Sequence, residues 1–210
     1  MSKGYEQESA PSPGHEHRFE RVIEPSGSTI YQCACGVTAS GPELHWKLRE
    51  ARKAGDVATL IEGLDDPVEG WFAARFLGDA GATDAVPELL RHLDSPDPEV
   101  RAEVVKSLGK LGASDALPQI ERAAENDEMP SVRMRAVEAA AELMPPERVR
   151  PLLHAALNDP GWGVRFAAAH TLGQIGDRSD LDALRAARRA EAWWRRGVYR
   201  KATRAIQRRR

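Results

Sequence analysis

The stretch PDPEVRAEVVKSLGKLG (96–112) recurs in altered form as MPSVRMRAVEAAAELM (129–144) and DPGWGVRFAAAHTLGQIG (159–176). Each copy contains a valine followed at once by an arginine, and the three valines are 32 residues apart: Val100, Val132 and Val164. An earlier copy, DPVEGWFAARFLGDAG (66–81), has Gly70 in the arginine position. A fixed period of this size predicts stacked repeats. We therefore expect binding residues on an extended surface rather than in a deep pocket.

A second recurring piece lies between these copies and adds another helix to each repeat. Pro87 and Pro118 fit the first turn of that helix, where the N–H that proline lacks would be unpaired in any case. Thr83, Ser114 and Ser179 stand just before it as candidate N-cap residues. Each repeat is thus predicted to be a pair of helices, and a further helix near 42–53 is predicted to precede the array. One repeat alone cannot bury its apolar stripe, exemplified by Val100, Val104, Leu108 and Leu111.

The repeated motif resembles the HEAT repeat, in the short form found in bilin-lyase-like proteins. The shared elements are Asp-Pro in the turn, Val-Arg opening the second helix, then Ala-Ala and Leu-Gly-x-Leu-Gly. The resemblance implies an all-α fold, a right-handed α-α superhelix whose second helices line the concave side. It also implies that each Val-Arg arginine bonds a turn aspartate of the neighbouring repeat, with Asp97, Asp127 and Asp159 as candidates.

The composition excludes several classes of protein. The sequence has no run of 18 apolar residues, so no membrane span is predicted. Its two cysteines are too few for a disulfide framework. No G-x-S-x-G or H-E-x-x-H motif occurs, so we predict no catalytic residues and no enzyme. A glycosylase-like or bilin-lyase-like activity is the alternative. Residues 1–14 are polar and rich in Pro and Ser, which predicts a disordered start and a cytoplasmic protein.

The segment 15–41 differs in kind from the repeats that follow. Two short strands are predicted around a turn at 25–28, with Ile23 paired with Ile30. This hairpin brings together four soft ligands that suit a closed tetrahedral zinc site: His15, His17, Cys33 and Cys35. A segment this small has almost no core, so a structural zinc would supply the folding energy it lacks. The segment resembles a small zinc ribbon, and a metal-free hairpin and a redox cysteine pair are the alternatives.

The charge of the chain is distributed unevenly. Residues 42–180 contain 16 Lys or Arg and 25 Asp or Glu, whereas 181–210 contain 11 and 2. A helix predicted from Glu191 carries one column of arginines with Trp193 beside it: Arg196, Arg200, Arg204 and Arg208. Nucleic acid and an acidic protein are both candidate partners for this basic surface, and a solvated capping helix is the third interpretation.

A candidate partner-binding groove follows from the register of the repeats. The position after the Val-Arg arginine is occupied by Trp71, Ala102, Met134 and Phe166, and the column one turn further is Arg75, Lys106, Glu138 and His170. Large apolar side chains beside charged ones are typical of a partner groove, with core filling as the alternative.

Two functions are compatible with these patterns. The first is a non-enzymatic scaffold that presents a concave HEAT surface to a protein or peptide. The second is nucleic-acid binding through the basic C-terminal helix, distantly like the HEAT-like alkylpurine DNA glycosylases. Those enzymes use a catalytic aspartate, and here Arg75 stands one turn after Trp71. The net acidic repeats also disfavour DNA in the groove.

Overall fold

The computed structural model describes residues 19–23, 29–33, 38–39 and 46–209, which fall into two compact units, 1–46 and 47–210. The first unit contains a small antiparallel sheet in the order β1-β2-β3. Its strands are β1 (Phe19–Ile23), β2 (Thr29–Cys33) and β3 (Thr38–Ala39). The two predicted strands are present and β3 is an addition.

The register of the hairpin differs by one residue from the prediction. Val22, not Ile23, pairs with Ile30, and Phe19 pairs with Cys33. The prediction was wrong because a turn at 25–28 is compatible with more than one register, and neither strand has a strict apolar alternation that would select one. Cys33 is buried.

The second unit consists of helices stacked in sequence order. Its helices are α1 (Trp46–Ala54), α2 (Val57–Glu62), α3 (Gly70–Asp79), α4 (Val86–Arg91), α5 (Pro98–Lys110), α6 (Leu117–Asn126), α7 (Pro130–Leu143), α8 (Pro146–Ala156), α9 (Trp162–Ile175), α10 (Leu181–Ala190) and α11 (Gly197–Arg208). From α2 onward these form five pairs, which confirms the all-α repeat architecture predicted from the 32-residue period. The helix predicted near 42–53 is also present as α1, with Leu48 buried, and residues 42–45 lie outside the described residues.

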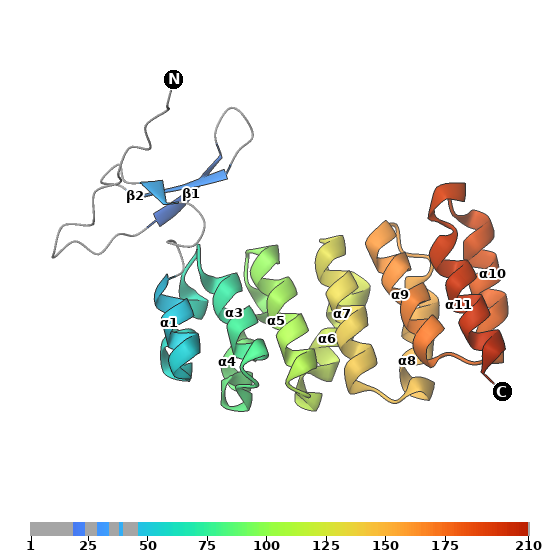
Figure 1. Ribbon diagram of the computed structural model, residues 1–210, viewed down its shortest axis with the longest axis horizontal. Coiled ribbons are helices and arrows are strands. Elements are labelled where there is room, and N and C mark those ends of the chain that lie inside the picture. Colours follow the sequence, from blue (N-terminus) through green and yellow to red (C-terminus); the bar gives the residue numbers. More distant parts are fainter. Residues whose placement is uncertain (1–18, 24–28, 34–37, 40–45, 210) are drawn as a thin grey trace, which may run out of the picture. The chain divides into compact units, whose positions relative to one another are not determined.

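The second helices of the pairs, α3, α5, α7, α9 and α11, pack against one another in that order (Figure 1). Their close approach depends on small residues, because Ala73, Ala136 and Ala168 are fully buried between neighbours. A single apolar cluster runs from α1 to α11, as expected for an array in which each repeat buries its neighbour's apolar stripe. We call the solvent-exposed side of these five helices the second-helix face.

The helix starts differ in detail from the prediction. Thr83 and Ser114 begin short 3-10 turns, Thr83–Ala85 and Ser114–Ala116, ahead of α4 and α6. Ser179 lies within such a turn, where Asp177 supplies the cap. Pro87 and Pro118 stand in the first turns of α4 and α6, as predicted. The C-terminal helix begins at Gly197 rather than at Glu191, because residues Trp193–Arg195 form a separate 3-10 turn before it.

Candidate functional site: the second-helix face and the basic C-terminal end

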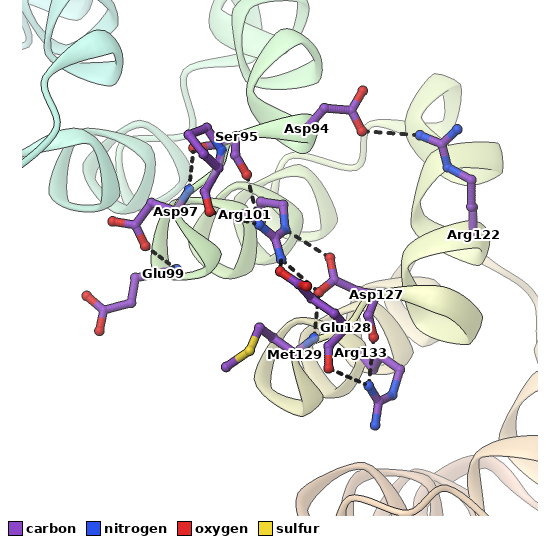
Figure 2. A network of polar contacts seen from close by, with 11 residues as sticks. Asp94, Ser95, Asp97, Glu99, Arg101, Arg122, Asp127, Glu128, Met129 and Arg133 are labelled. Atoms are coloured by element: carbon purple, nitrogen blue, oxygen red, sulfur yellow. Dashed lines mark hydrogen bonds and ion pairs between the residues drawn. The ribbon is translucent and has the colours of Figure 1, made fainter.

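The Val-Arg arginines form a ladder of ion pairs along the edge of the second helices. Nε and Nη2 of Arg101 donate to the two carboxylate oxygens of Asp127, at 2.9 and 3.0 Å (Figure 2). Arg133 binds Asp159 in the same way, at 2.8 and 2.9 Å. Arg165 reaches Glu191 at 2.9 and 2.8 Å. Each pair joins residues 26 apart, so every arginine of this arginine ladder ties its own repeat to the next one.

Each arginine also fixes the turn that precedes its own helix. Nη1 of Arg133 donates to the carbonyl oxygen of Asp127 at 2.6 Å, and that aspartate accepts from Arg101 (Figure 2). Asp127 and Asp159 in addition accept from the backbone N–H of Met129 and Gly161, at 2.9 and 2.6 Å. The turns at Asp127 and Asp159 are therefore held from both sides by charge-assisted hydrogen bonds, which are stronger than neutral ones.

The ladder begins one repeat later than a strict period would give. Asp97 caps α5 by accepting from the N–H of Glu99 at 2.8 Å, and it makes no ion pair within residues 46–209. The reason lies at Gly70, which occupies the arginine position of the preceding repeat. A Cβ at Gly70 would lie 2.8 Å from the carbonyl oxygen of Leu64, so no larger residue fits there without movement.

The ladder ends at a tyrosine. Tyr199 follows Val198 in α11, where Val-Arg stands in the earlier repeats, and it is fully buried. Its hydroxyl donates to Glu191 at 3.4 Å, the same carboxylate that Arg165 binds. The sequence prediction missed Glu191 because only turn aspartates were considered as ladder carboxylates, and the last one is a glutamate.

The ladder carboxylates are held in the ionised state. Burial opposes ionisation of Asp127, but the hydrogen bonds from Arg101 and from the Met129 N–H outweigh it and hold the pKa of this carboxyl below its ordinary value. The same balance, with Arg133 and the Gly161 N–H as donors, lowers the pKa of Asp159. Glu191 has a lowered pKa as well, through Arg165 and the Ala192 N–H against its burial.

These lowered pKa values predict a loss of stability in acid. A carboxyl with a lower pKa in the folded state contributes stability that is complete above its unfolded pKa of about 4 and is lost as the pH falls through the folded pKa. We expect the urea midpoint to be level from about pH 5 to 7 and to fall steadily below about pH 4. Arg133→Ala should make that fall shallower, because the pKa of Asp159 then approaches its ordinary value. A midpoint that is constant down to pH 3 would contradict this.

An aromatic column lies on the exposed side of α9. Trp162 contacts Phe166 edge to face at 5.4 Å between ring centroids, and Phe166 stacks on His170 at 6.0 Å with nearly parallel rings. The guanidinium of Arg195 lies 5.1 Å above the Trp162 ring, in cation–π geometry. Phe166 is 42% exposed, which is unusual for a phenylalanine flanked by two other rings.

The residues of the predicted groove differ in how far they are exposed to solvent. Met134 is half-buried on α7, and a Cβ at Gly163 would lie 3.2 Å from its sulfur, so Met134 packs over the start of α9. Trp71 is also half-buried and packs against the core. Lys106 bonds Glu103 at 2.8 Å, whereas Arg75 and His170 are exposed. Phe166 and His170 therefore lie at the surface, while Trp71 and Met134 also contact the core.

The aromatic column continues into arginines on the next helix. Because Val198 and Tyr199 correspond to Val164 and Arg165, Arg200 and Arg204 correspond to Phe166 and His170. Both arginines are exposed on α11, which packs directly on α9. The second-helix face thus changes from aromatic to cationic between its last two helices.

The predicted basic surface divides into structural and exposed members. Arg196 precedes α11 and donates to the Glu191 and Arg189 carbonyls at 2.8 and 3.3 Å, so it closes the end of α10. Arg200, Arg204 and Arg208 are exposed and form no ion pair in the described chain. Trp193 is exposed in the turn before α11 rather than on that helix.

Three of the four predicted zinc ligands, His15, His17 and Cys35, lie outside the described residues, and only Cys33 lies within them. Within the described ranges, no cluster of three or more His, Cys, Asp or Glu side chains is arranged to bind a metal. The residues 1–14 predicted to be disordered also lie outside. None of the described helices is both long and apolar enough to span a membrane.

The chain is similar to a curated protein and to a solved structure. A curated relative, "Bilin biosynthesis protein RpcF" of Synechococcus sp. (strain WH8020), is 35% identical over 130 residues. The alignment covers 57% of this chain and 62% of the relative, so the chain spans less than two thirds of that protein. Among solved structures, "The structure of the complex of CpcE and CpcF of phycocyanin lyase from Nostoc sp. PCC7120" contains a chain with a similar fold. Its TM-score is 0.57 at 24% identity, over 71% of this chain and 98% of that one.

The family itself follows from the repeats. The family described as HEAT repeats matches residues 57–141 and 120–204, a range that takes in every helix pair from α2/α3 to α10/α11. The fold, the arginine ladder and this match agree. The chain therefore belongs to the HEAT-repeat family.

Proposed function

We propose that this protein is a non-enzymatic binding module that holds a protein partner against its second-helix face, at α7, α9 and α11. The observation that carries the proposal is the exposed Phe166, held between Trp162 and His170 on α9, with the half-buried Met134 packed over the start of the same helix. Aromatic and methionine side chains in such a setting are the usual centres of protein interfaces. The fixed rings would lose little conformational freedom on binding.

Two further observations support a protein as the partner. The solved structure with a similar fold is a complex of two proteins, CpcE and CpcF. The arginines at the positions equivalent to Phe166 and His170, Arg200 and Arg204, are exposed and would form a charged rim beside the aromatic column. A partner with an apolar centre and an acidic border would complement this face.

Replacement of Phe166 tests the proposal. We expect Phe166→Gln to reduce binding of the native partner by about tenfold or more, because such losses concentrate in a few central side chains. The matched control is Met129→Gln, which removes another exposed apolar side chain, 39% exposed, at the start of α7. The measurement is the amount of the main protein that co-purifies with each chromosomally tagged variant. Equal recovery with Phe166→Gln and wild type would refute the proposed face.

A second candidate function is the handling of a bilin or of a protein that carries one. The observation in its favour is the 35% identity to the bilin biosynthesis protein RpcF over 130 residues. A bilin is a flat conjugated molecule with carboxylates, and the aromatic column beside Arg200 and Arg204 offers stacking and charge to such a ligand. Titration with a linear tetrapyrrole should then shift its visible absorption band, and the shift should be lost in Phe166→Gln. An unchanged spectrum at saturating protein would exclude this function.

For the N-terminal unit we retain the proposal of one structural zinc bound by His15, His17, Cys33 and Cys35. It is supported by the combination of imidazole and thiolate groups on a segment with little apolar core. Metal analysis of protein purified without a polyhistidine tag should give about one zinc per chain, and far less in the variant with Cys33→Ser and Cys35→Ser. Folded wild-type protein without zinc would refute the site.

A further inference from the structure

The arginines of the C-terminal end fall into two groups by what they contact. Several complete the fold: Arg195 covers the Trp162 ring, Arg196 closes the end of α10, and Arg209 donates to the carbonyls of Gly173 and Gly176 at the end of α9. A second group has no ion-pair partner among the residues that the structure describes: Arg188, Arg189, Arg200, Arg204 and Arg208. Structural roles therefore leave an excess of free positive charge on α10 and α11.

Four of these free arginines line one groove. Arg188 and Arg189 of α10 face Arg200 and Arg204 of α11 across a cavity of about 470 Å³, which Arg185 also lines. Among the residues with described positions, Arg185 alone of the five has a carboxylate partner, Asp182, at 2.9 Å. Like charges one helical turn apart, such as Arg200 and Arg204, destabilise a helix. The residues that line the groove include no Asp or Glu that would offset the repulsion between these arginines.

Two exposed tryptophans lie in the turn between the two helices that form the groove. Trp193 and Trp194 are 73% and 66% exposed in the turn that connects α10 to α11. Their rings are perpendicular, with centroids 5.7 Å apart, so each presents a separate face to solvent. They differ in this from Trp71 and Trp162, which pack against the core.

We propose that this groove, which we call the α10/α11 groove, binds single-stranded nucleic acid, with phosphates on Arg188, Arg189, Arg200 and Arg204 and bases on Trp193 and Trp194. Arginine forks match phosphate oxygens, and every unpaired base has a face that stacks on an indole. Duplex DNA has no free base faces for the two tryptophans, so an unpaired strand fits better. The net charge of −9 over residues 42–180 repels a polyanion from the other repeats and confines it to a short site at this end.

The first arm of the test removes charge. Binding of a labelled oligonucleotide of about 12 nucleotides, single-stranded or as a duplex, is measured by fluorescence anisotropy at about 50 and 200 mM salt. The variant combines Arg188→Gln, Arg189→Gln and Arg204→Gln. The matched control combines Arg91→Gln, Arg122→Gln and Arg148→Gln, three exposed arginines elsewhere on the array, so both chains lose the same charge. Circular dichroism confirms that both stay helical.

We expect the groove variant to bind the single strand at least about tenfold more weakly than wild type at low salt, with the control near wild type. The slope of log affinity against log salt should fall by about 2, since three phosphate contacts are lost at about 0.7 each. Wild-type protein that does not bind the single strand, or an equal loss in the control, would overturn the proposal. Because the partner test relies on Phe166, its outcome is independent of this one.

The second arm separates nucleic acid from an acidic protein. Trp193→Ala with Trp194→Ala should weaken single-strand binding about tenfold, whereas Trp46→Ala, which removes an equally exposed tryptophan, should not. A poly-glutamate peptide serves as competitor at equal charge concentration. Displacement of the oligonucleotide by the peptide, tighter binding of the duplex, or an unchanged affinity in the tryptophan variant would each overturn the proposal.

Discussion

The free energy of unfolding of Arg133→Ala is expected to be about 3 kcal/mol lower than that of wild type. The substitution removes two hydrogen bonds to Asp159 and two to the carbonyls of Asp127 and Glu128. The Arg133 and Asp159 side chains are only 10% and 11% exposed. It leaves the Asp159 carboxylate partly buried without its counter-charge, which costs more than the pair itself contributes. The measurement is urea denaturation followed by helical circular dichroism at neutral pH.

Two controls separate the ladder from charge in general. Arg122→Ala removes an ion pair to Asp94 in which both side chains are largely exposed, so it should cost less than about 1 kcal/mol. Arg133→Lys should recover little of the loss, because an ammonium group cannot bond both Asp159 oxygens and a carbonyl at once. If Arg133→Ala and Arg122→Ala have equal midpoints, the ladder contributes nothing to the coupling of repeats.

Gly78→Ala is expected to destabilise the protein by about 2 kcal/mol, although alanine is the better helix former. A Cβ at Gly78 of α3 would lie 2.6 Å from the Cβ of Ser107 and 2.9 Å from its Cα, in the contact between α3 and α5. Ser107 cannot turn away, since its buried hydroxyl donates to the carbonyl of Ala74 at 2.8 Å. The two helices must then separate, and the apolar contacts between them weaken.

The matched control for this substitution is Gly197→Ala. A Cβ there meets no atom within 4 Å, so the same change at the start of α11 should be neutral or stabilise by up to about 1 kcal/mol. Both variants are compared by urea denaturation. Equal stability of Gly78→Ala and Gly197→Ala would show that α3 and α5 are not in close contact.

The resemblance of the repeated motif to the HEAT repeat implied the ladder, and the structure confirms it in the middle of the array. Asp127 and Asp159 do bind the arginines of the neighbouring repeat. The exceptions are at the ends of the array. Asp97 has no arginine partner because position 70 is a glycine, where a Cβ would lie 2.8 Å from the Leu64 carbonyl oxygen. The last ladder carboxylate is a glutamate, Glu191, instead of an aspartate. A terminal repeat has one neighbour rather than two, so its residues follow a different pattern.

The C-terminal surface could be predicted only in part. The spacing of Arg200, Arg204 and Arg208 placed them on one helix, which α11 confirms. The spacing did not show that the chain turns at Trp193–Arg195, nor that Arg188 and Arg189 of α10 face that helix across a groove. Periodicity describes the side of one helix, whereas a groove depends on how two helices pack. The exposure of Phe166 was undecided for the same reason, since its column also contains residues that touch the core.

The central claim is that a protein partner binds the second-helix face, and hydroxyl-radical footprinting of the native complex tests it most directly. We expect oxidation of Phe166, Met134 and Trp162 to fall when the partner is bound, because the partner would exclude solvent from these side chains. Trp46, exposed elsewhere in the chain, serves as the internal reference. Unchanged oxidation of Phe166 and its neighbours in a saturated complex, with protection at other residues, would contradict the claim.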